Sequence, residues 1–594
     1  MMSAQTIPAA IKAVAQNVPD HIALQIPQNN GFRSHTYREL VTQMEQGADQ
    51  LRKAELRPGD RIILLAENMP EWAIACLGAL EMGATVVPLD PALTLEEIKT
   101  LIGRADVRGI MLSESQFEIL SSNLPNGLPI FNIEDCLTPF GECPKAVAQN
   151  VIPTPDPNAD IALLLFTSGT TGIPKGVLLD HAALIQTSQT CVDAIEPDPH
   201  SEDRILCVLP LHHVTGFTVT VLGPLLMKAK VTFVETLSAE AILSTMQKTQ
   251  TTVLPGVPRL FELFYTSICQ KVATKGSFAQ RVFKILCRVN AAFRRITPWN
   301  MGHVLFGTVH RAFGGSLRVC CSGAAPLPLD VLKGLEQLGF NVIEAYGLTE
   351  SAGVVTANPL SQRKPGTVGI PAFDTKIKIT NPTPSSSEGE ICIAGSVLMR
   401  GYFRDQAATK EVIREGWLHT GDLGRIDQHG HLTVTGRLKE LIVTSGGKNV
   451  SPIEVEQRYH NLSGVKELAV FGMPAEAGYG DDIHAAVVLD ATSLKEVEVA
   501  IMNQAPEIPS HMRIQQLYEV NELPKTTTLK VKRSELKKLG SSKSGEKEKP
   551  RSETPLDEDT KHVLEIVTEV MRQAGETRRV GTDSTLQFEL GIDS

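Results

Sequence analysis

Continuous apolar runs that alternate with helical patterns constrain this chain most strongly. RIILLAE (61–67) and TVVPLD (85–90) are apolar throughout, whereas 37–53 and 71–84 have the pattern of helices. Strands that are buried on both faces and alternate with helices indicate a parallel sheet covered on both sides. Polar or glycine-bearing loops follow similar runs at 161–169, 252–258 and 342–350. Because ligands bind at such strand ends in open α/β sheets, we predict an α/β fold with its site there.

The pattern changes after about residue 375, which indicates further units. KIKIT (376–380), GEICIAG (389–395) and HLTVTG (431–436) predict short strands of a small antiparallel unit. We assign residues 1–436 to a large N-terminal domain of layered sheets and helices. A small α+β domain follows at 437–540, because ELAVFGM and HAAVVLD predict strands flanked by helices. Residues 541–556 are charged and lack apolar periodicity, as in a flexible linker.

The composition narrows the class of protein. The chain has 594 residues, of which 42% are hydrophobic and 21% charged, and its net charge is -10. This acidic balance argues against a nucleic-acid partner. The ten cysteines show no CxxC spacing, so we expect buried thiols. The N-terminus lacks the features of a signal peptide, and no apolar run has the length of a membrane span, which predicts a cytoplasmic location.

The stretch FTSGTTGIPKGV (166–177) follows one of the predicted strands. Its backbone amides and hydroxyls suit phosphate oxygens, and its glycines permit close approach of the backbone. The spacing differs from GxxxxGK[ST], so this is not a standard P-loop. By itself the stretch also fits a polar surface loop.

Seven further stretches resemble the sequence motifs of one enzyme family, and they occur in the order in which that family has them. They are LPLHHVTGF (209–217), SGAAPL (322–327), EAYGLTE (344–350), GEICIAGSVLMRGY (389–402), LHTGDLGRID (418–427), GRLKELIVTSGGKNVSPIEVE (436–456) and LPKTTTLKVKR (523–533). Together with LLFTSGTTGIPKGV, they make residues 10–540 resemble the adenylate-forming enzymes, which include acyl-CoA synthetases, firefly luciferase and peptide-synthetase adenylation domains. The resemblance implies ATP and Mg²⁺ as cofactors, and a small mobile C-terminal lid over a large N-terminal domain.

The resemblance also implies roles for individual residues. The β and γ phosphates of ATP would be held by Thr167, Ser168, Gly169, Thr170, Thr171, Gly172 and Lys175. Glu350 would bind Mg²⁺ and Thr349 would face the α-phosphate. Tyr346 would stack on adenine beside the backbone of Gly323, Ala324 and Ala325. Asp422 would accept the ribose hydroxyls, with Arg437 as a second ribose or phosphate contact. The residues alone leave non-functional roles open: Lys175 could be a solvated loop lysine, Glu350 a surface carboxylate and Asp422 a helix cap.

Two lysines of the C-terminal domain have specific roles in the mechanism that the resemblance implies. Lys530 stands where the family has a lysine that bridges the α-phosphate and the attacking carboxylate, although Lys532 is a competitor. The family usually has glycine before this lysine, and here the residue is Leu529. Lys439 stands at the hinge position about which the lid would turn for the second half-reaction.

The acyl substrate is indicated by two segments. Residues 209–217 contain no acid to pair with an ammonium group, which disfavours an amino acid. His213 resembles the residue that gates the carboxylate and thiol path. Residues 263–329 contain no acid but nine basic residues, and an insertion here resembles long-chain fatty acyl-CoA synthetases. We therefore expect a medium- or long-chain fatty acid.

An apolar helical face within 277–296 allows two interpretations. It consists of Phe278, Val282, Ile285, Leu286, Val289, Phe293 and Ile296. The face either packs on the core or, with its basic neighbours, makes residues 270–320 a peripheral contact for anionic lipid or an acidic carrier protein.

The chain ends in LQFELGIDS, which resembles the start of an acyl carrier domain. Ser594 would then be the site of phosphopantetheine attachment. Since the helix that should follow is absent, we expect 557–594 to be a truncated carrier segment in which Ser594 stays unmodified. The predicted activity is an AMP-forming acid–thiol ligase that uses CoA or a carrier phosphopantetheine. Two alternatives are an acyl-AMP ligase that loads only a carrier protein, and a degenerate acyl or nucleotide sensor.

Overall fold

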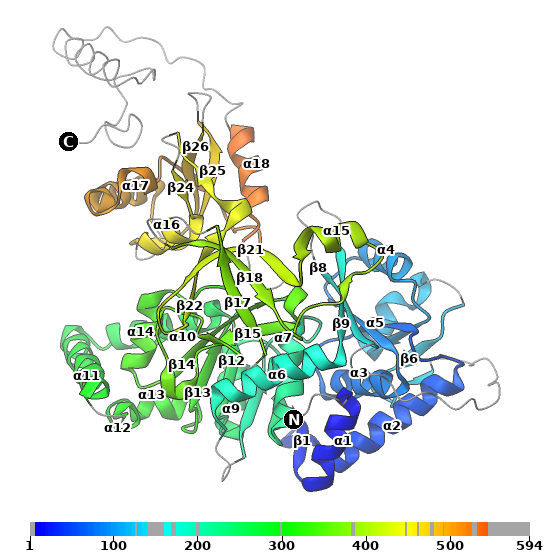
Figure 1. Ribbon diagram of the computed structural model, residues 1–594. Helices are drawn as coiled ribbons and strands as arrows, with labels where there is room; N and C mark the ends of the chain where they lie inside the picture. Colours follow the sequence, from blue (N-terminus) through cyan, green and yellow to red (C-terminus); the bar gives the residue numbers. More distant parts are fainter. Residues whose placement is uncertain are drawn as a thin grey trace, which may run out of the picture. The chain divides into compact units, whose positions relative to one another are not determined.

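The structure is a computed structural model. It describes residues 6–124, 127–139, 160–167, 174–197, 202–296, 300–372, 374–381, 387–445, 448–459, 462–475, 480–490, 492–525 and 531–543. The chain divides into two compact units (Figure 1). The first comprises Met1–Pro382, Ile391–Thr420 and Ile426–Thr433, and the second comprises Thr383–Glu390, Gly421–Arg425 and Val434–Ser594.

The first unit contains an eight-stranded sheet with a parallel centre. Its strand order is β19 (Gly401–Tyr402), β9 (Lys175–Asp180), β8 (Ile161–Thr167), β4 (Thr85–Leu89), β3 (Arg61–Leu65), β5 (Gly109–Leu112), β6 (Ile130–Asn132) and β7 (Thr138–Pro139). β8, β4, β3, β5 and β6 run parallel, whereas β9 returns antiparallel to β8. β3 and β4 are almost completely buried, as their continuous apolar sequences predict.

A nine-stranded sheet forms the other half of this unit. Its order is β16 (Ile370–Pro371), β15 (Gly353–Ala357), β14 (Val342–Leu348), β13 (Val319–Ser322), β12 (Val253–Gly256), β10 (Arg204–Cys207), β11 (Lys230–Phe233), β1 (Ile22–Gln28) and β2 (Gly31–Thr36). From β14 through β13, β12, β10 and β11 to β1, the neighbouring strands pair in parallel. The strands expected within 161–169, 252–258 and 342–350 form as β8, β12 and β14, and each has a parallel neighbour.

Helices pack on both sheets (Figure 1). The largest core contains α1 (Ile7–Asn17), α2 (Tyr37–Lys53), α3 (Pro70–Met82) and α6 (His181–Ile195). α2 begins where Thr36 and Glu39 form a capping box. Other helices of the first unit are α4 (Leu95–Ala105), α5 (Glu114–Leu120), α7 (Val214–Phe217), α8 (Gly223–Leu226), α9 (Ala239–Thr249), α10 (Pro258–Ala273), α11 (Ser277–Ile296), α12 (Gly302–Leu305), α13 (Gly307–Ala312), α14 (Leu329–Gln337) and α15 (Gln406–Val412).

The small sheet expected after residue 375 is present. It contains β17 (Lys376–Thr380), β18 (Gly389–Ala394), β21 (Trp417–Ile426) and β20 (Ile413–Arg414), and β22 (Leu432–Arg437) pairs with β21. Among the described residues, no helix has the length and apolarity to cross a membrane.

The second unit has a core of its own. β25 (Val465–Pro474), β26 (Asp481–Leu489) and β27 (Gln516–Glu519) form a three-stranded sheet, and β23 (Ile442–Val443) pairs with β24 (Asn449–Val450). Helices α16 (Pro452–Arg458), α17 (Leu494–Gln504) and α18 (Arg533–Lys543) belong to the same unit. The two longer strands were predicted, but β27 was not. It is only four residues long, and it lies parallel to β26.

Candidate active site

The predicted phosphate loop begins and ends at one edge of the eight-stranded sheet. Parallel β4 and β8 pair through Val86 and Leu163, so Asp90 and Thr167 follow at the same carboxyl edge. Thr167 also pairs with Lys175 of β9, and its Oγ1 lies 3.4 Å from the Lys175 carbonyl oxygen. Residues 168–173 lie outside the described residues, and they include the predicted phosphate ligands Ser168, Gly169, Thr170, Thr171 and Gly172.

A tyrosine joins the end of this loop to the predicted metal ligand. The Lys175 Nζ lies 4.8 Å from the centroid of the Tyr402 ring, and the Tyr402 hydroxyl donates to Glu350 Oε1 at 2.9 Å. Tyr402 reaches this position because β19 pairs with β9, which places Tyr402 beside Val177. Two motifs far apart in the sequence are thus connected through one side chain. Sequence reasoning missed Tyr402, although it ends the quoted motif GEICIAGSVLMRGY.

The Tyr402 hydroxyl is held in its neutral, donating form. Burial raises the pKa of Tyr402, and the nearby Glu350 carboxylate raises it further. The Glu350 main chain is also fixed, because its carbonyl accepts from the Met399 N–H at 2.9 Å. Among the described residues Glu350 makes no other side-chain hydrogen bond, which leaves Oε2 available. A carboxylate oxygen held in this way fits a magnesium ligand.

A close approach of two strands shapes the turn that carries Glu350. A Cβ added at Gly347 would lie 1.7 Å from the Gly353 carbonyl oxygen, so only glycine fits here. The β14–β15 register shifts between Tyr346 and Gly347, and such irregularities re-aim the side chains that follow. Thr349 and Glu350 come next, in the short helix η3 (Thr349–Ser351).

The predicted adenine contacts gather at the carboxyl edge of the nine-stranded sheet. The parallel strands β12, β13 and β14 place Gly256 beside Ser322, and Ser322 beside Glu344. The backbone of 323–325 therefore follows β13 next to Tyr346 at the end of β14. Gly323 donates its N–H to the Gly256 carbonyl at 3.4 Å, and Ala324 takes a left-handed φ of 71°. Tyr346 is half-buried.

His213 is held at the start of α7 by a tight turn. A Cβ at Gly216 would lie 1.9 Å from the Pro210 carbonyl oxygen, and His213 donates its N–H to the same oxygen at 3.2 Å. The ring centroids of His212 and His213 are 4.3 Å apart. His212 Nε2 lies 3.6 Å from Asp90. Burial lowers the pKa of His212, although the Asp90 charge opposes the shift. The histidine pair thus adjoins the edge that carries Thr167.

The second unit pairs the two predicted ribose contacts. Arg437 Nε lies 2.9 Å from Asp422 Oδ1, and the Asp422 carboxylate is almost fully buried whereas Arg437 is exposed. The turn before Asp422 is fixed by Glu390, whose Oε1 accepts from the Gly421 N–H at 3.1 Å. Gly421 has a φ of 70°, which favours glycine. Glu390 was not predicted as a site residue, because its role depends on the hydrogen bond with Gly421 that only the folded chain forms.

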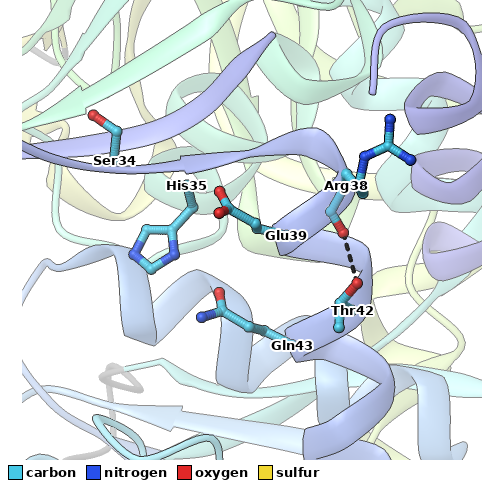
Figure 2. A pocket seen from close by; sticks show the side chains of 6 residues that line it. All are labelled: Ser34, His35, Arg38, Glu39, Thr42 and Gln43. Atoms are coloured by element: carbon cyan, nitrogen blue, oxygen red, sulfur yellow. Dashed lines mark hydrogen bonds between the residues drawn. The ribbon is translucent and has the colours of Figure 1, made fainter. Parts of the chain in front are cut away.

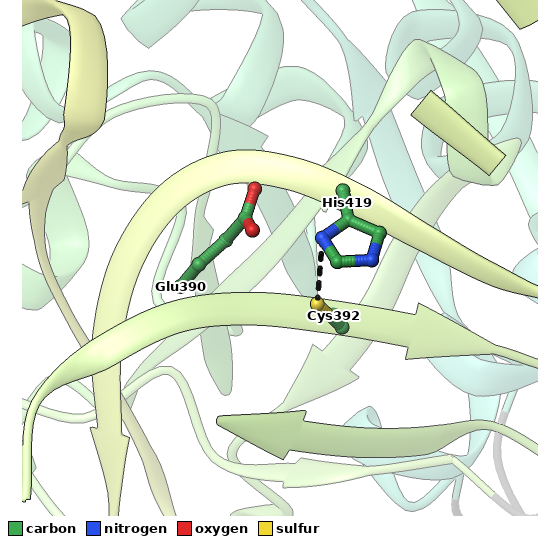
Figure 3. Close-up of side chains that lie close together, drawn as sticks. All are labelled: Glu390, Cys392 and His419. Carbon is green, nitrogen blue, oxygen red and sulfur yellow. Dashed lines mark hydrogen bonds between the residues drawn. The ribbon is translucent and has the colours of Figure 1, made fainter. Parts of the chain in front are cut away.

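Two other groups of side chains contain no residue of the predicted site. Figure 3 shows Cys392 of β18 and His419 of β21, whose Sγ and Nδ1 are 3.4 Å apart, with Glu390 on β18. We interpret the sulfur–imidazole pair as a hydrogen bond within the small sheet. Figure 2 shows a pocket of about 430 Å³ at the start of α2, lined by Ser34, His35, Arg38, Glu39, Thr42 and Gln43. Glu39 serves the α2 capping box, and the Thr42 hydroxyl donates to the Arg38 carbonyl.

Ion pairs hold the residues on either side of the predicted lid lysine. Lys525 Nζ lies 2.6 Å from Glu467 Oε2, and Lys525 pairs with Val531 through a β-bridge. Arg533 contacts Glu440 at 2.9 Å and Glu456 at 2.7 Å. Residues 526–530, with Leu529 and the predicted catalytic Lys530, lie outside the described residues, as does Ser594.

The predicted hinge lysine adjoins one of these ion pairs. Lys439 lies in the short helix η5 (Leu438–Glu440), directly before Glu440. Burial raises the pKa of Glu456, and the neighbouring Arg533 opposes that shift. Arg533 also donates Nε–H to the Val470 carbonyl at 3.0 Å. The segment that contains Lys439 and Glu440 is thereby tied to the start of α18 and to β25.

Known families and solved structures are similar to this chain. Residues 11–403 match the model of the AMP-binding enzyme family, and residues 454–530 match its C-terminal domain. A long-chain-fatty-acid–CoA ligase, FadD15 of Mycobacterium bovis, is 28% identical over 479 residues, which cover 76% of this chain and 78% of the relative. Feruloyl-CoA synthase of Amycolatopsis sp is 29% identical over 452 residues, which cover 75% of this chain and 82% of the relative. The ATP-bound structure of MatB from Rhodopseudomonas palustris is similar with a TM-score of 0.71 and 26% identity, covering 90% of this chain and 99% of that one.

Proposed function

The chain belongs to the AMP-binding enzyme family, and on this premise we propose that it activates a medium- or long-chain fatty acid and transfers the acyl group to a thiol. It is an acid–thiol ligase of the AMP-forming type. The observation that carries the assignment is the contact chain from Lys175 through Tyr402 to Glu350. It joins the end of the predicted phosphate loop to the predicted metal ligand.

In the first half-reaction, a carboxylate oxygen of the acid attacks the α-phosphorus of ATP. The bond between this phosphorus and the bridging oxygen breaks, and pyrophosphate leaves with the electron pair. Nucleophile and target are both anions, so the protein has to neutralise charge and hold the reactants in line. Thr167 and Lys175, with the loop 168–172, would bind the β and γ phosphates.

Each part of the bound nucleotide would have its own group of protein ligands. Mg²⁺ held by Glu350 would supply positive charge to the phosphate oxygens. Thr349 would contact the α-phosphate, and Tyr346 would stack on adenine beside residues 323–325. Asp422 would bind the ribose hydroxyls with Arg437. Lys530 would bridge the α-phosphate and the attacking carboxylate, and a preorganised charge of this kind changes the rate ~10²–10³-fold.

In the second half-reaction, a thiolate sulfur attacks the acyl carbon of the adenylate. A thioester bond forms, the acyl–phosphate bond breaks, and AMP leaves. His213 would gate the path of the thiol, and Lys439 would lie at the hinge of the rearrangement between the two steps. The proposed acceptor is CoA, because the named relatives are CoA ligases.

Two features support a fatty acid as substrate. The relatives include ligases named for long-chain fatty acids, although others are named for ferulate and coumarate. Residues 209–217 contain no acid to pair with an amino acid ammonium group. A second candidate is a ligase that loads only carrier proteins, which is favoured by the likeness of LQFELGIDS to the start of a carrier domain.

The test is acid-dependent exchange of labelled pyrophosphate into ATP. A panel should contain octanoate, palmitate, ferulate and phenylalanine, and AMP release should then be measured with CoA, with a phosphopantetheinylated carrier protein, or with neither. We expect exchange with the fatty acids and turnover with CoA. Glu350→Gln should abolish exchange. Exchange with ferulate alone would overturn the substrate assignment, turnover with the carrier alone would favour the second candidate, and no exchange with any acid would favour a sensor.

A further inference from the structure

Helix α11 has two apolar faces, of which only one packs on the protein. Phe283 and Leu286 contact the core cluster beside the nine-stranded sheet, and Cys287 and Asn290 are buried. Asn290 donates its side-chain N–H to the Gln337 carbonyl at 2.9 Å. These contacts dock the helix, so its other face does not need to pack in order to hold it in place.

The second face is open to solvent. It consists of five side chains at helical spacing, which we name the apolar row. Their exposed fractions are 80% for Phe278, 38% for Val282, 57% for Ile285, 47% for Val289 and 83% for Ile296. Of the two interpretations of this face, packing on the core is therefore wrong for the five residues. Phe293 and Leu286 remain half-buried.

Basic side chains border the apolar row. Arg281, Lys284, Arg288 and Arg295 are all exposed on α11. Arg294 is excluded, because its guanidinium turns inward to the Glu336 carbonyl at 2.7 Å. No acidic residue occurs from 263 to 329, although the whole chain carries a net charge of -10. Positive charge is thus concentrated beside exposed apolar surface on an otherwise acidic protein.

We propose that α11 is a membrane-surface helix that binds anionic lipid, with the apolar row lying in the interface. An amphipathic helix with a cationic polar face is suited to this position, since its apolar side chains enter the acyl boundary and its basic ones meet the headgroups. The row from residue 278 to residue 296 extends about 27 Å at 1.5 Å per residue.

The distribution of exposure favours a membrane over an acidic carrier protein. The two ends of the row, Phe278 and Ile296, are its most exposed members, so a partner must cover the full length to bury both. A lipid surface does this without a matching shape. A fatty acid partitions into the same surface, which would bring substrate to the enzyme. This last step rests on the proposed function, whereas lipid binding does not.

The test is sedimentation of the full chain with vesicles, which requires no activity. Phosphatidylcholine vesicles are compared with vesicles that contain roughly a third phosphatidylglycerol. We expect binding to the anionic vesicles, weakened by salt because the basic side chains contribute to it. Absence of binding to both kinds of vesicle would overturn the proposal, even if pyrophosphate exchange is normal.

Matched variants assign the binding to α11. The apolar variant is Phe278→Ser, Ile285→Ser, Ile296→Ser, and the basic variant is Arg281→Gln, Lys284→Gln, Arg288→Gln. The control changes three exposed apolar residues elsewhere: Ile119→Ser, Leu237→Ser and Val499→Ser. We expect each α11 variant to lose at least about tenfold in vesicle partitioning, and the control to bind as wild type.

The substituted side chains are exposed, so the melting temperatures should be unchanged, and this is measured first. The apolar variant, the basic variant and the control should also exchange pyrophosphate as fast as wild type with water-soluble octanoate. Vesicle binding that survives in both α11 variants would overturn the proposal. So would α11-dependent binding of an acidic carrier protein in the absence of vesicle binding.

Discussion

Removing a single hydroxyl tests whether Tyr402 positions Glu350, the proposed metal ligand. Tyr402→Phe deletes the 2.9 Å hydrogen bond to Glu350 and keeps the ring on which Lys175 lies. A hydrogen bond to a charged group contributes about 1.5–3 kcal/mol, which corresponds to about 10- to 150-fold in rate. Glu350 is half-buried, so water replaces part of the lost bond. We therefore expect a fall of about 10- to 30-fold in pyrophosphate exchange.

The measurement is exchange as a function of Mg²⁺ concentration at saturating ATP and acid. The variant should need more Mg²⁺ for half-maximal exchange, because its Glu350 carboxylate is no longer held. Tyr37→Phe is the control, since it deletes a buried hydroxyl that donates to the carbonyls of Leu225 and Ala229. That change should lower the melting temperature and leave the Mg²⁺ dependence unaltered. Wild-type Mg²⁺ dependence in Tyr402→Phe, together with abolished exchange in Glu350→Gln, would refute the positioning role.

Three further changes test separate parts of the argument. Gly347→Ala should lower the free energy of unfolding by about 1–3 kcal/mol in urea titrations, because its Cβ would meet the Gly353 carbonyl oxygen at 1.7 Å; an unchanged stability would contradict that geometry. Burial raises the pKa of Glu344 from 4.5 to about 7, so its contribution to stability is highest below pH 4.5 and falls as the pH rises to about 7. Glu344→Gln should therefore be more stable than wild type at about pH 8, by up to about 3 kcal/mol, and should lose this advantage at about pH 4; an equal difference at both pH values would argue against it. Lys530→Ala should abolish adenylate formation but spare thioester formation from supplied acyl-AMP, with Lys532→Ala as the matched control; equal loss of both steps would refute the role of Lys530.

The sequence by itself determined the fold class and the order of the motifs. Continuous apolar runs such as RIILLAE can be buried only with both faces covered, and β3 is accordingly central in a parallel sheet. The helix expected at 37–53 forms over Tyr37–Lys53, because its periodicity and its capping box are local properties. Motif resemblance also named Glu350, Asp422 and Arg437, since a side chain's chemical type is present in the sequence.

Only the tertiary structure decided which side chains meet. Tyr402 bridges Lys175 and Glu350 because β19 pairs with β9 across more than two hundred residues of sequence, and no local pattern specifies that pairing. Glu390 fixes Gly421 for the same reason. In α11, periodicity predicts an apolar face, but exposure depends on what packs against the helix. Contacts at long sequence separation follow from the global packing of the sheets, and local sequence patterns do not encode them.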